Sequence, residues 1–167
     1  MKTLVTLTGT PTLPVTDVAL LGLTFEHSEP TFLDPFTSPS GGDWLFQNSG
    51  ALHLAGTRNC SVSGSLFVNL GGTGVMVSGW NRGARVMDSE FLWLGDAGVI
   101  SAGLSGNVYD NSDPGSAYGE GLTLSGNFAH EVGLFVKQTG FYYHAMTGNA
   151  TVTGNVFFNG PRAGISE

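Results

Sequence analysis

The side chains best suited to chemistry recur at one position of a repeated segment. The copies are VSGSLFVNLG (62–71), VMDSEFLWLG (86–95), LSGNFAHEVG (124–133), the shorter VTGNVFFNG (152–160) and a weaker LLGLTFEH (20–27). Their eighth residues are His27, Asn69, Trp93, Glu131 and Asn159. Polar groups beside an aromatic ring can stack on sugars and hydrogen-bond to them. The series predicts a shallow glycan groove, with a mixed surface and a partly buried Trp93 as the alternative.

Further polar and basic side chains follow the same segments in the chain. Lys137 comes shortly after one copy and Arg162 shortly after another. We therefore predict that the groove contains a set of substrate-binding residues. The set is His27, Trp93, His130, Lys137, Tyr142 and Arg162.

Glycoside hydrolysis needs two carboxyl groups, about 5 Å apart in retaining enzymes and up to about 9.5 Å apart in inverting ones. Repeats that stack at about 4.8 Å would align equivalent residues in columns, and no column of this alignment contains two acids. Glu131 therefore needs a partner from outside its column. Candidates are Asp34 and Asp43, Asp96, and Asp110, Asp113 and Glu120, all of which could equally be solvated loop charges.

Asp96 is the strongest of these candidates because it lies beside a turn of the repeat. If the chain is an enzyme, we predict Asp96 and Glu131 as its catalytic residues. Polysaccharide β-elimination is a weaker alternative. Lys137 or Arg162 could accept the proton, but the sequence has no tight aspartate cluster to hold calcium.

The elements that would position these residues are short strands. The copies begin at residues 20, 62, 86, 124 and 152, which gives steps of 42, 24, 38 and 28 residues. A period in the low twenties with insertions indicates a solenoid, and short apolar runs bounded by Gly, Asn and Ser indicate strands and turns. We predict an all-β parallel β-helix of about five to six coils, forming one domain over 1–167. Insertions are expected near 29–50 and 101–121.

Columns of like residues should run through this solenoid. Val62, Val86, Leu124 and Val152 would form an apolar stack, and Phe67, Phe91 and Phe157 another with Ala129 as its gap. Ser65, Ser89, Asn127 and Asn155 would form a polar ladder at the turn. Neither end shows a polar capping segment, which a solenoid uses to protect its end strands. We expect a piece of a longer β-helix or a minimal one, with end-to-end association through uncapped coils.

Composition excludes several classes of partner. The net charge of −7 and the absence of a basic stripe argue against nucleic acid, and the charge would also repel acidic polymers. No apolar run approaches the ~20 residues of a membrane span, and the N-terminus shows no signal peptide. Cys60 is the only cysteine and the four histidines are scattered, so we predict neither a metal nor another cofactor.

Several motifs resemble right-handed parallel β-helix proteins of the pectin-lyase-like superfamily, and more narrowly those related to glycoside hydrolase family 141. PSGGDW (39–44) and NGPRAGI (159–165) are the most specific, with GALHLAG, VMVSGWNRG, WLGDAGV and FVKQTGFYYHA between them. The resemblance implies an extracellular or cell-surface protein directed at polysaccharide, with further coils in family members. Relatives often carry an acid where this chain has Ala55 or Val136, and basic residues in the region of Gln47-Asn48. This chain has His144 where relatives favour Gln. These departures predict reduced or absent activity.

Three classes of function remain open. The first is a glycoside hydrolase or lyase, the second a non-catalytic glycan-binding β-helix, and the third a structural or surface-binding solenoid. The third class needs a flat, regular face, and the irregular steps and bulky insertions argue against it. Insertions on one side of a solenoid more often build a binding site. The sequence therefore predicts polysaccharide binding or processing.

Overall fold

The structure is a computed structural model that describes residues 1–36, 44–103 and 118–166. Within these residues there is no helix, and every strand pairing is parallel. None of the described segments forms a helix with the length and hydropathy that a membrane crossing needs. The all-β class predicted from the sequence is confirmed.

The strands form three sheets, which we call A, B and C. The main path of sheet A is β1 (Val5–Thr8), β5 (Leu52–Arg58), β8 (Val75–Arg82), β11 (Val99–Ala102), β15 (Tyr142–Ala145) and β19 (Ile165–Ser166). Its side pairings involve β2 (Val15–Thr16), β12 (Gly119–Glu120) and β16 (Thr147–Gly148). Sheet B contains β3 (Ala19–Leu21), β6 (Ser61–Ser63), β9 (Arg85–Met87), β13 (Thr123–Ser125) and β17 (Thr151–Thr153). Sheet C contains β4 (Thr24–Glu26), β7 (Leu66–Leu70), β10 (Glu90–Leu94), β14 (Phe128–His130) and β18 (Val156–Phe158).

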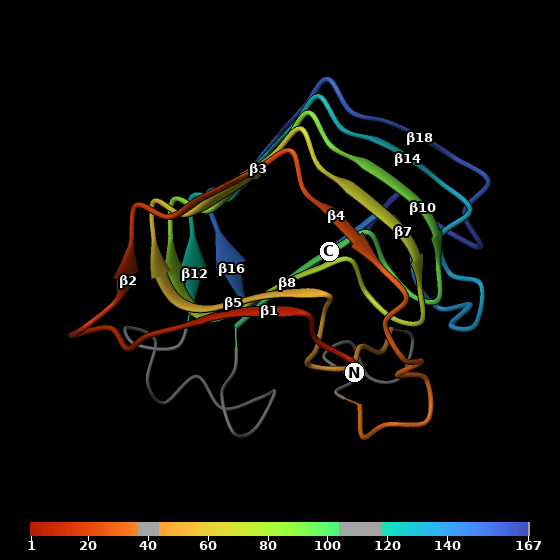
Figure 1. Ribbon diagram of the computed structural model, residues 1–167, viewed down its shortest axis with the longest axis horizontal. Helices are drawn as coiled ribbons and strands as arrows, with labels where there is room; N and C mark the ends of the chain where they lie inside the picture. The colour runs from red at the N-terminus through yellow and green to blue at the C-terminus, as the bar shows by residue number, and fades with distance from the viewer. Residues whose placement is uncertain (37–43, 104–117, 167) are drawn as a thin grey trace.

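The chain visits the sheets in the order A, B, C and then returns to A, so each strand pairs with the strand one pass earlier and one pass later. We call one such pass a coil. Figure 1 shows the strands of sheet C side by side along one wall, with β1, β5 and β8 together along another. Three parallel sheets stacked coil on coil are consistent with the predicted parallel β-helix.

The predicted aliphatic column is confirmed by the strand register. Leu20 pairs with Val62, Val62 with Val86, Val86 with Leu124 and Leu124 with Val152. The three middle residues have an exposed fraction of 0%. The middle residue of each of the three inner strands of sheet B, β6, β9 and β13, is therefore buried against the same residue types one coil away.

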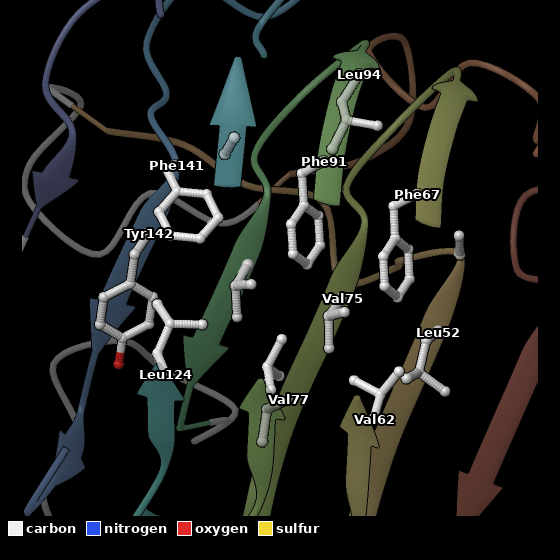
Figure 2. Close-up of a cluster of buried hydrophobic side chains, with 14 of the residues drawn as sticks. Leu52, Val62, Phe67, Val75, Val77, Phe91, Leu94, Leu124, Phe141 and Tyr142 are labelled. Atoms are coloured by element: carbon white, nitrogen blue, oxygen red, sulfur yellow. The ribbon is translucent and has the colours of Figure 1, made fainter. Parts of the chain in front are cut away.

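The predicted phenylalanine column is also confirmed, and it extends by one residue to Phe25. The Phe25 and Phe67 rings stack with centroids 4.5 Å apart, and Phe67 and Phe91 with centroids 4.6 Å apart. Figure 2 shows the parallel Phe67 and Phe91 rings above the aliphatic side chains of the same core. Ala129 leaves a gap in the column, and the ring of Phe141, directly before β15, packs edge-on against Phe91 nearby.

The predicted polar ladder joins the coils at the turn between sheets B and C. The Ser65 backbone N–H donates to Ser89 Oγ at 3.1 Å, and the Ser89 N–H to Asn127 Oδ1 at 3.1 Å. The Asn127 N–H donates in turn to Asn155 Oδ1 at 3.0 Å. Each side chain thus satisfies a backbone donor of the preceding coil, which a tight turn would otherwise leave buried and unpaired.

Residues 44–46, at the end of the first insertion, pack on the outer face of sheet A. Phe46 is fully buried there with Met76, Ile100 and Tyr143, and Trp44 packs against the same cluster. Burial raises the pKa of the Tyr143 hydroxyl to about 12. The second insertion separates β11 from β12, and most of its residues lie outside the described part of the chain.

The last coil leaves apolar residues partly exposed. Val152 and Phe157, which end the aliphatic and phenylalanine columns, have exposed fractions of 36% and 40%. Val156 and Phe158 are exposed by 54% and 46%. End-to-end association through this coil stays a prediction.

The ladder yields a stability prediction. Asn127→Ala should lower the free energy of unfolding by about 2–4 kcal/mol, because the buried Ser89 N–H and Val86 C=O would each lose a partner. Asn127→Ser should cost less than half as much, since serine fills this position in two other coils. Urea unfolding of the three proteins measures both values. Equal losses for Ala and Ser would contradict the ladder.

Candidate functional site

The eighth residues of the repeat copies form a column at the ends of the sheet C strands. All of them have left-handed backbone conformations. The φ angles are 60° at His27, 51° at Asn69, 55° at Trp93, 52° at Glu131 and 51° at Asn159. Asparagine tolerates this region well, whereas a bulky residue such as tryptophan is unusual there. A left-handed residue of this kind costs on the order of 1 kcal/mol or more and persists only where its surroundings hold it in place.

The left-handed turn explains why these side chains face outward. Strict alternation would put Trp93 on the same side as the buried Phe91. Instead Phe91 and Leu94 are both 0% exposed, and Trp93 between them is 49% exposed. The conformation therefore lets the strand bury the residues on both sides of the turn while the eighth residue of the repeat projects into solvent.

A groove of about 480 Å³ runs beside the Trp93 indole. Its lining residues are Ser28, Pro30, Asn69, Leu70, Gly71, Trp93, Leu134 and Phe135, and we call it the Trp93 groove. Phe135 is 50% exposed, and its ring contacts the Phe32 ring at a centroid distance of 5.5 Å. The groove thus presents two half-exposed aromatic rings to solvent, with the Asn69 amide in its wall.

Glu131 is held by two polar neighbours in the same region. Asn159 Nδ2 donates to Glu131 Oε1 at 2.8 Å, and His130 Nδ1 donates to the other carboxylate oxygen. The Asn159 hydrogen bond, followed by that of His130, lowers the pKa of the Glu131 carboxyl below its ordinary value. Glu131 is therefore suited to accept hydrogen bonds or to act as a base or nucleophile, and poorly suited to act as a general acid.

Asp96, the second predicted catalytic carboxylate, is fully buried in the interior. Thr73 Oγ1 donates to Asp96 Oδ2 at 3.2 Å, and Thr139 also donates to the carboxylate. Burial raises the pKa of the Asp96 carboxyl to about 6, against the lowering effect of Thr139, Thr73 and the Ala97 N–H. Thr73 belongs to the preceding coil and Thr139 to the next, so Asp96 ties three coils together.

The chain segment after Glu131 covers Asp96. The Gly133 N–H donates to the Asp96 carbonyl at 2.9 Å, and the Phe135 and Val136 N–H groups donate to the Gly95 carbonyl. Asp96 does not line the Trp93 groove, whereas Leu134 and Phe135 of this segment do. The catalytic role of Asp96 and Glu131 stays a prediction, and the 0% exposure of Asp96 counts against its contact with a polymer.

The other predicted binding residues are dispersed. The Tyr142 side chain packs in the hydrophobic core and is only 1% exposed. Tyr142 therefore does not line the surface. His27 is exposed near Glu26, and Lys137 Nζ donates to the Gly133 carbonyl at 2.8 Å. Arg162 lies 4.4 Å from the Trp44 ring centroid and lines a smaller groove of about 220 Å³ that includes Asn159. The structure brings Trp93, His130 and Glu131 together, but not the whole set.

The remaining predicted acids are placed as follows. Asp34 pairs with Lys2 at 2.6 Å, and Glu120 pairs with Arg82 at 3.4 Å. Asp43, Asp110 and Asp113 lie outside the described residues. Within the described ranges, no cluster of three or more His, Cys, Asp or Glu side chains is arranged to hold a metal ion.

Sequence reasoning missed the other aromatic wall of the groove. Leu134 and Phe135 directly follow Gly133, the glycine that closes a repeat copy. Both side chains are partly exposed, by 43% and 50%. The long spacing between β14 and β15 was the available sign that this segment takes another path.

Asp96 generates a pH prediction. Its carboxyl has a folded pKa of about 6 and an ordinary value of 3.8. The folded state therefore binds the proton more tightly, so the contribution to stability is full below about pH 3.8 and is lost as the pH rises through 6. The loss amounts to roughly 3 kcal/mol for a difference of about two pKa units.

Urea unfolding of the unmodified chain and Asp96→Asn at intervals from pH 4 to 7 tests this prediction. The amide cannot titrate, so the stability of the unmodified chain should fall relative to the variant as the pH rises. A stability difference between Asp96→Asn and the unmodified chain that stays constant with pH would contradict the buried, titrating carboxyl.

Comparisons with known proteins give no relative for this chain, because no family model, curated protein or solved structure matches it.

Proposed function

We propose that this chain binds a polysaccharide in the Trp93 groove. The observation that carries the proposal is the half-exposed Trp93 indole, fixed on a left-handed turn beside a groove of about 480 Å³. An aromatic ring held by backbone geometry loses little conformational freedom when a sugar stacks on it. The Phe135 ring on the same groove supplies a second apolar surface.

The polar residues around the groove favour a neutral sugar. Asn69 lies in its wall, and Glu131, next to Trp93 in the column, accepts hydrogen bonds from Asn159 and His130. Amides and carboxylates bind hydroxyl groups, while the apolar face of a pyranose suits an aromatic ring. The ionised Glu131 and the net charge of −7 disfavour an acidic chain at this position.

The proposal includes the finer assignment that the sequence resemblance implies. We take the fold to be a right-handed parallel β-helix of the pectin-lyase-like superfamily, related to glycoside hydrolase family 141. Strands that return to the same sheet in parallel nearly always cross over in the right-handed sense, which supports this hand. A polysaccharide ligand would place the protein outside the cell or on its surface.

Trp93→Asn tests the groove without disturbing the turn, because Asn69 and Asn159 adopt the same backbone conformation. The substitution should weaken binding of a neutral glycan by about tenfold or more, corresponding to ~1.4 kcal/mol or more, and should leave the unfolding transition unchanged or raise it. Calorimetric titration with neutral xylan-type and fucosylated oligosaccharides provides the measurement. Leu13→Ala, a change at another residue that is 78% exposed, should have no effect on binding.

Two results would overturn this proposal. One is an unmodified chain that binds none of these glycans. The other is a Trp93→Asn protein that binds as tightly as the unmodified chain.

Hydrolysis is a second candidate function, favoured by the ionised Glu131 carboxylate next to the half-exposed Trp93. A hydrolase needs a proton donor as well, and the buried Asp96 does not reach the groove surface. Glu131→Gln should abolish turnover while leaving glycan affinity within about threefold if this candidate is right. Binding by the unmodified chain with no turnover of any of these glycans leaves the binding function alone.

A further inference from the structure

A β-bulge within sheet A, shortly before the corner with sheet B, places an aromatic side chain out of the ladder. In the pairing of β5 with β8 the register shifts between Ala55 and Thr57, so Gly56 faces two residues, Gly79 and Trp80. Both glycines have positive φ, 68° and 64°. A bulge bends its strand and re-aims a side chain, and here the re-aimed side chain is the partly buried Trp80 indole.

Two guanidinium groups from neighbouring coils contact this indole. Arg58 and Arg82 are partners in the β5–β8 register. Their guanidinium carbons lie 5.6 Å and 4.8 Å from the Trp80 ring centroid. Cations over an aromatic face are attracted by the ring quadrupole, so Trp80 holds two like charges close together that would otherwise repel each other.

A third arginine comes from the adjacent strand of sheet B. Arg85, the first residue of β9, donates from Nη2 to the carbonyl of Asn59, which directly follows Arg58. We call Arg58, Trp80, Arg82 and Arg85 the arginine corner. Three of the six Lys and Arg residues of the chain lie here, in a protein of net charge −7.

The arginine corner is only partly neutralised by the protein. Arg82 pairs with Glu120 at 3.4 Å and donates to the Tyr118 and Asn81 carbonyls, so its position is fixed. No carboxylate of the described residues forms an ion pair with Arg58 or Arg85. Arg58 is exposed, and its guanidinium forms no ion pair with any residue that the structure describes.

We propose that the arginine corner binds an oxyanion carried by a polymeric ligand, such as a sulfate ester or a carboxylate. The planar, always charged guanidinium matches both groups in a two-point hydrogen bond. Trp80 orients the Arg58 group in advance, which reduces the entropy lost on binding. The site is separate from the Trp93 groove, because it stands where sheet A meets sheet B rather than at the end of sheet C, and it requires a negatively charged ligand.

Matched dextrans test the proposal, because dextran sulfate, carboxymethyl-dextran and unmodified dextran share one backbone. Calorimetric titration at two salt concentrations should show binding of a charged dextran that weakens with salt. The pair Arg58→Gln/Arg85→Gln should reduce that binding at least tenfold, while its unfolding transition and its response to unmodified dextran stay the same. The sulfate and carboxymethyl arms show which oxyanion the corner prefers.

Lys2→Gln is the control, since it removes one positive charge far from the corner in the fold. Arg58→Gln alone should weaken binding of the charged dextran several-fold, and Lys2→Gln should leave it unchanged. Equal losses in these two single variants would mean that only net charge matters and would overturn the proposal. Absence of binding to both charged dextrans would also overturn it.

Discussion

Parallel pairing of each strand with the strand one coil away is the constraint on which the rest of this structure depends. Because the register is in phase in all three sheets, apart from the bulge in the β5–β8 pairing, like residues stack on like residues. Backbone groups are satisfied between coils, so the core can consist of columns rather than of a mixed interior. The same register also aligns outward-facing side chains in columns. Both proposed binding sites contain residues of such columns.

The turns decide which of these columns reach solvent. At the corner between sheets B and C, buried serine and asparagine side chains cap the backbone N–H groups of the preceding coil. At the end of sheet C, left-handed residues project outward between two inward neighbours. Trp93 stands at a position where two other coils have asparagine, so a structural turn also exposes an aromatic ring. In this way one backbone geometry serves both the packing and the proposed binding of sugar.

Much of the fold could be predicted from the sequence because stacked columns repeat residue types. The aliphatic column through Val62 and Val86 and the ladder through Ser65 and Asn127 follow from the alignment of the copies. The direction of individual side chains could not be predicted from the alignment, because turns interrupt the alternation of inward and outward side chains along a strand. Asp96 and Tyr142 therefore turned out to be buried although they were predicted to face a ligand. The bulge at Gly79-Trp80 and the path of Leu134-Phe135 depend on contacts between coils that no single copy contains.

Disulfide trapping between the left-handed residues at the ends of the sheet C strands tests the register of the coils most directly. Neighbouring coils are about 4.8 Å apart, within the usual Cα separation of about 4.4–6.8 Å for a disulfide, whereas residues two coils apart are too distant. The account predicts that Asn69→Cys/Trp93→Cys forms a disulfide under mild oxidation and that Asn69→Cys/Glu131→Cys remains reduced. A bond in the second pair, or none in the first, would contradict it.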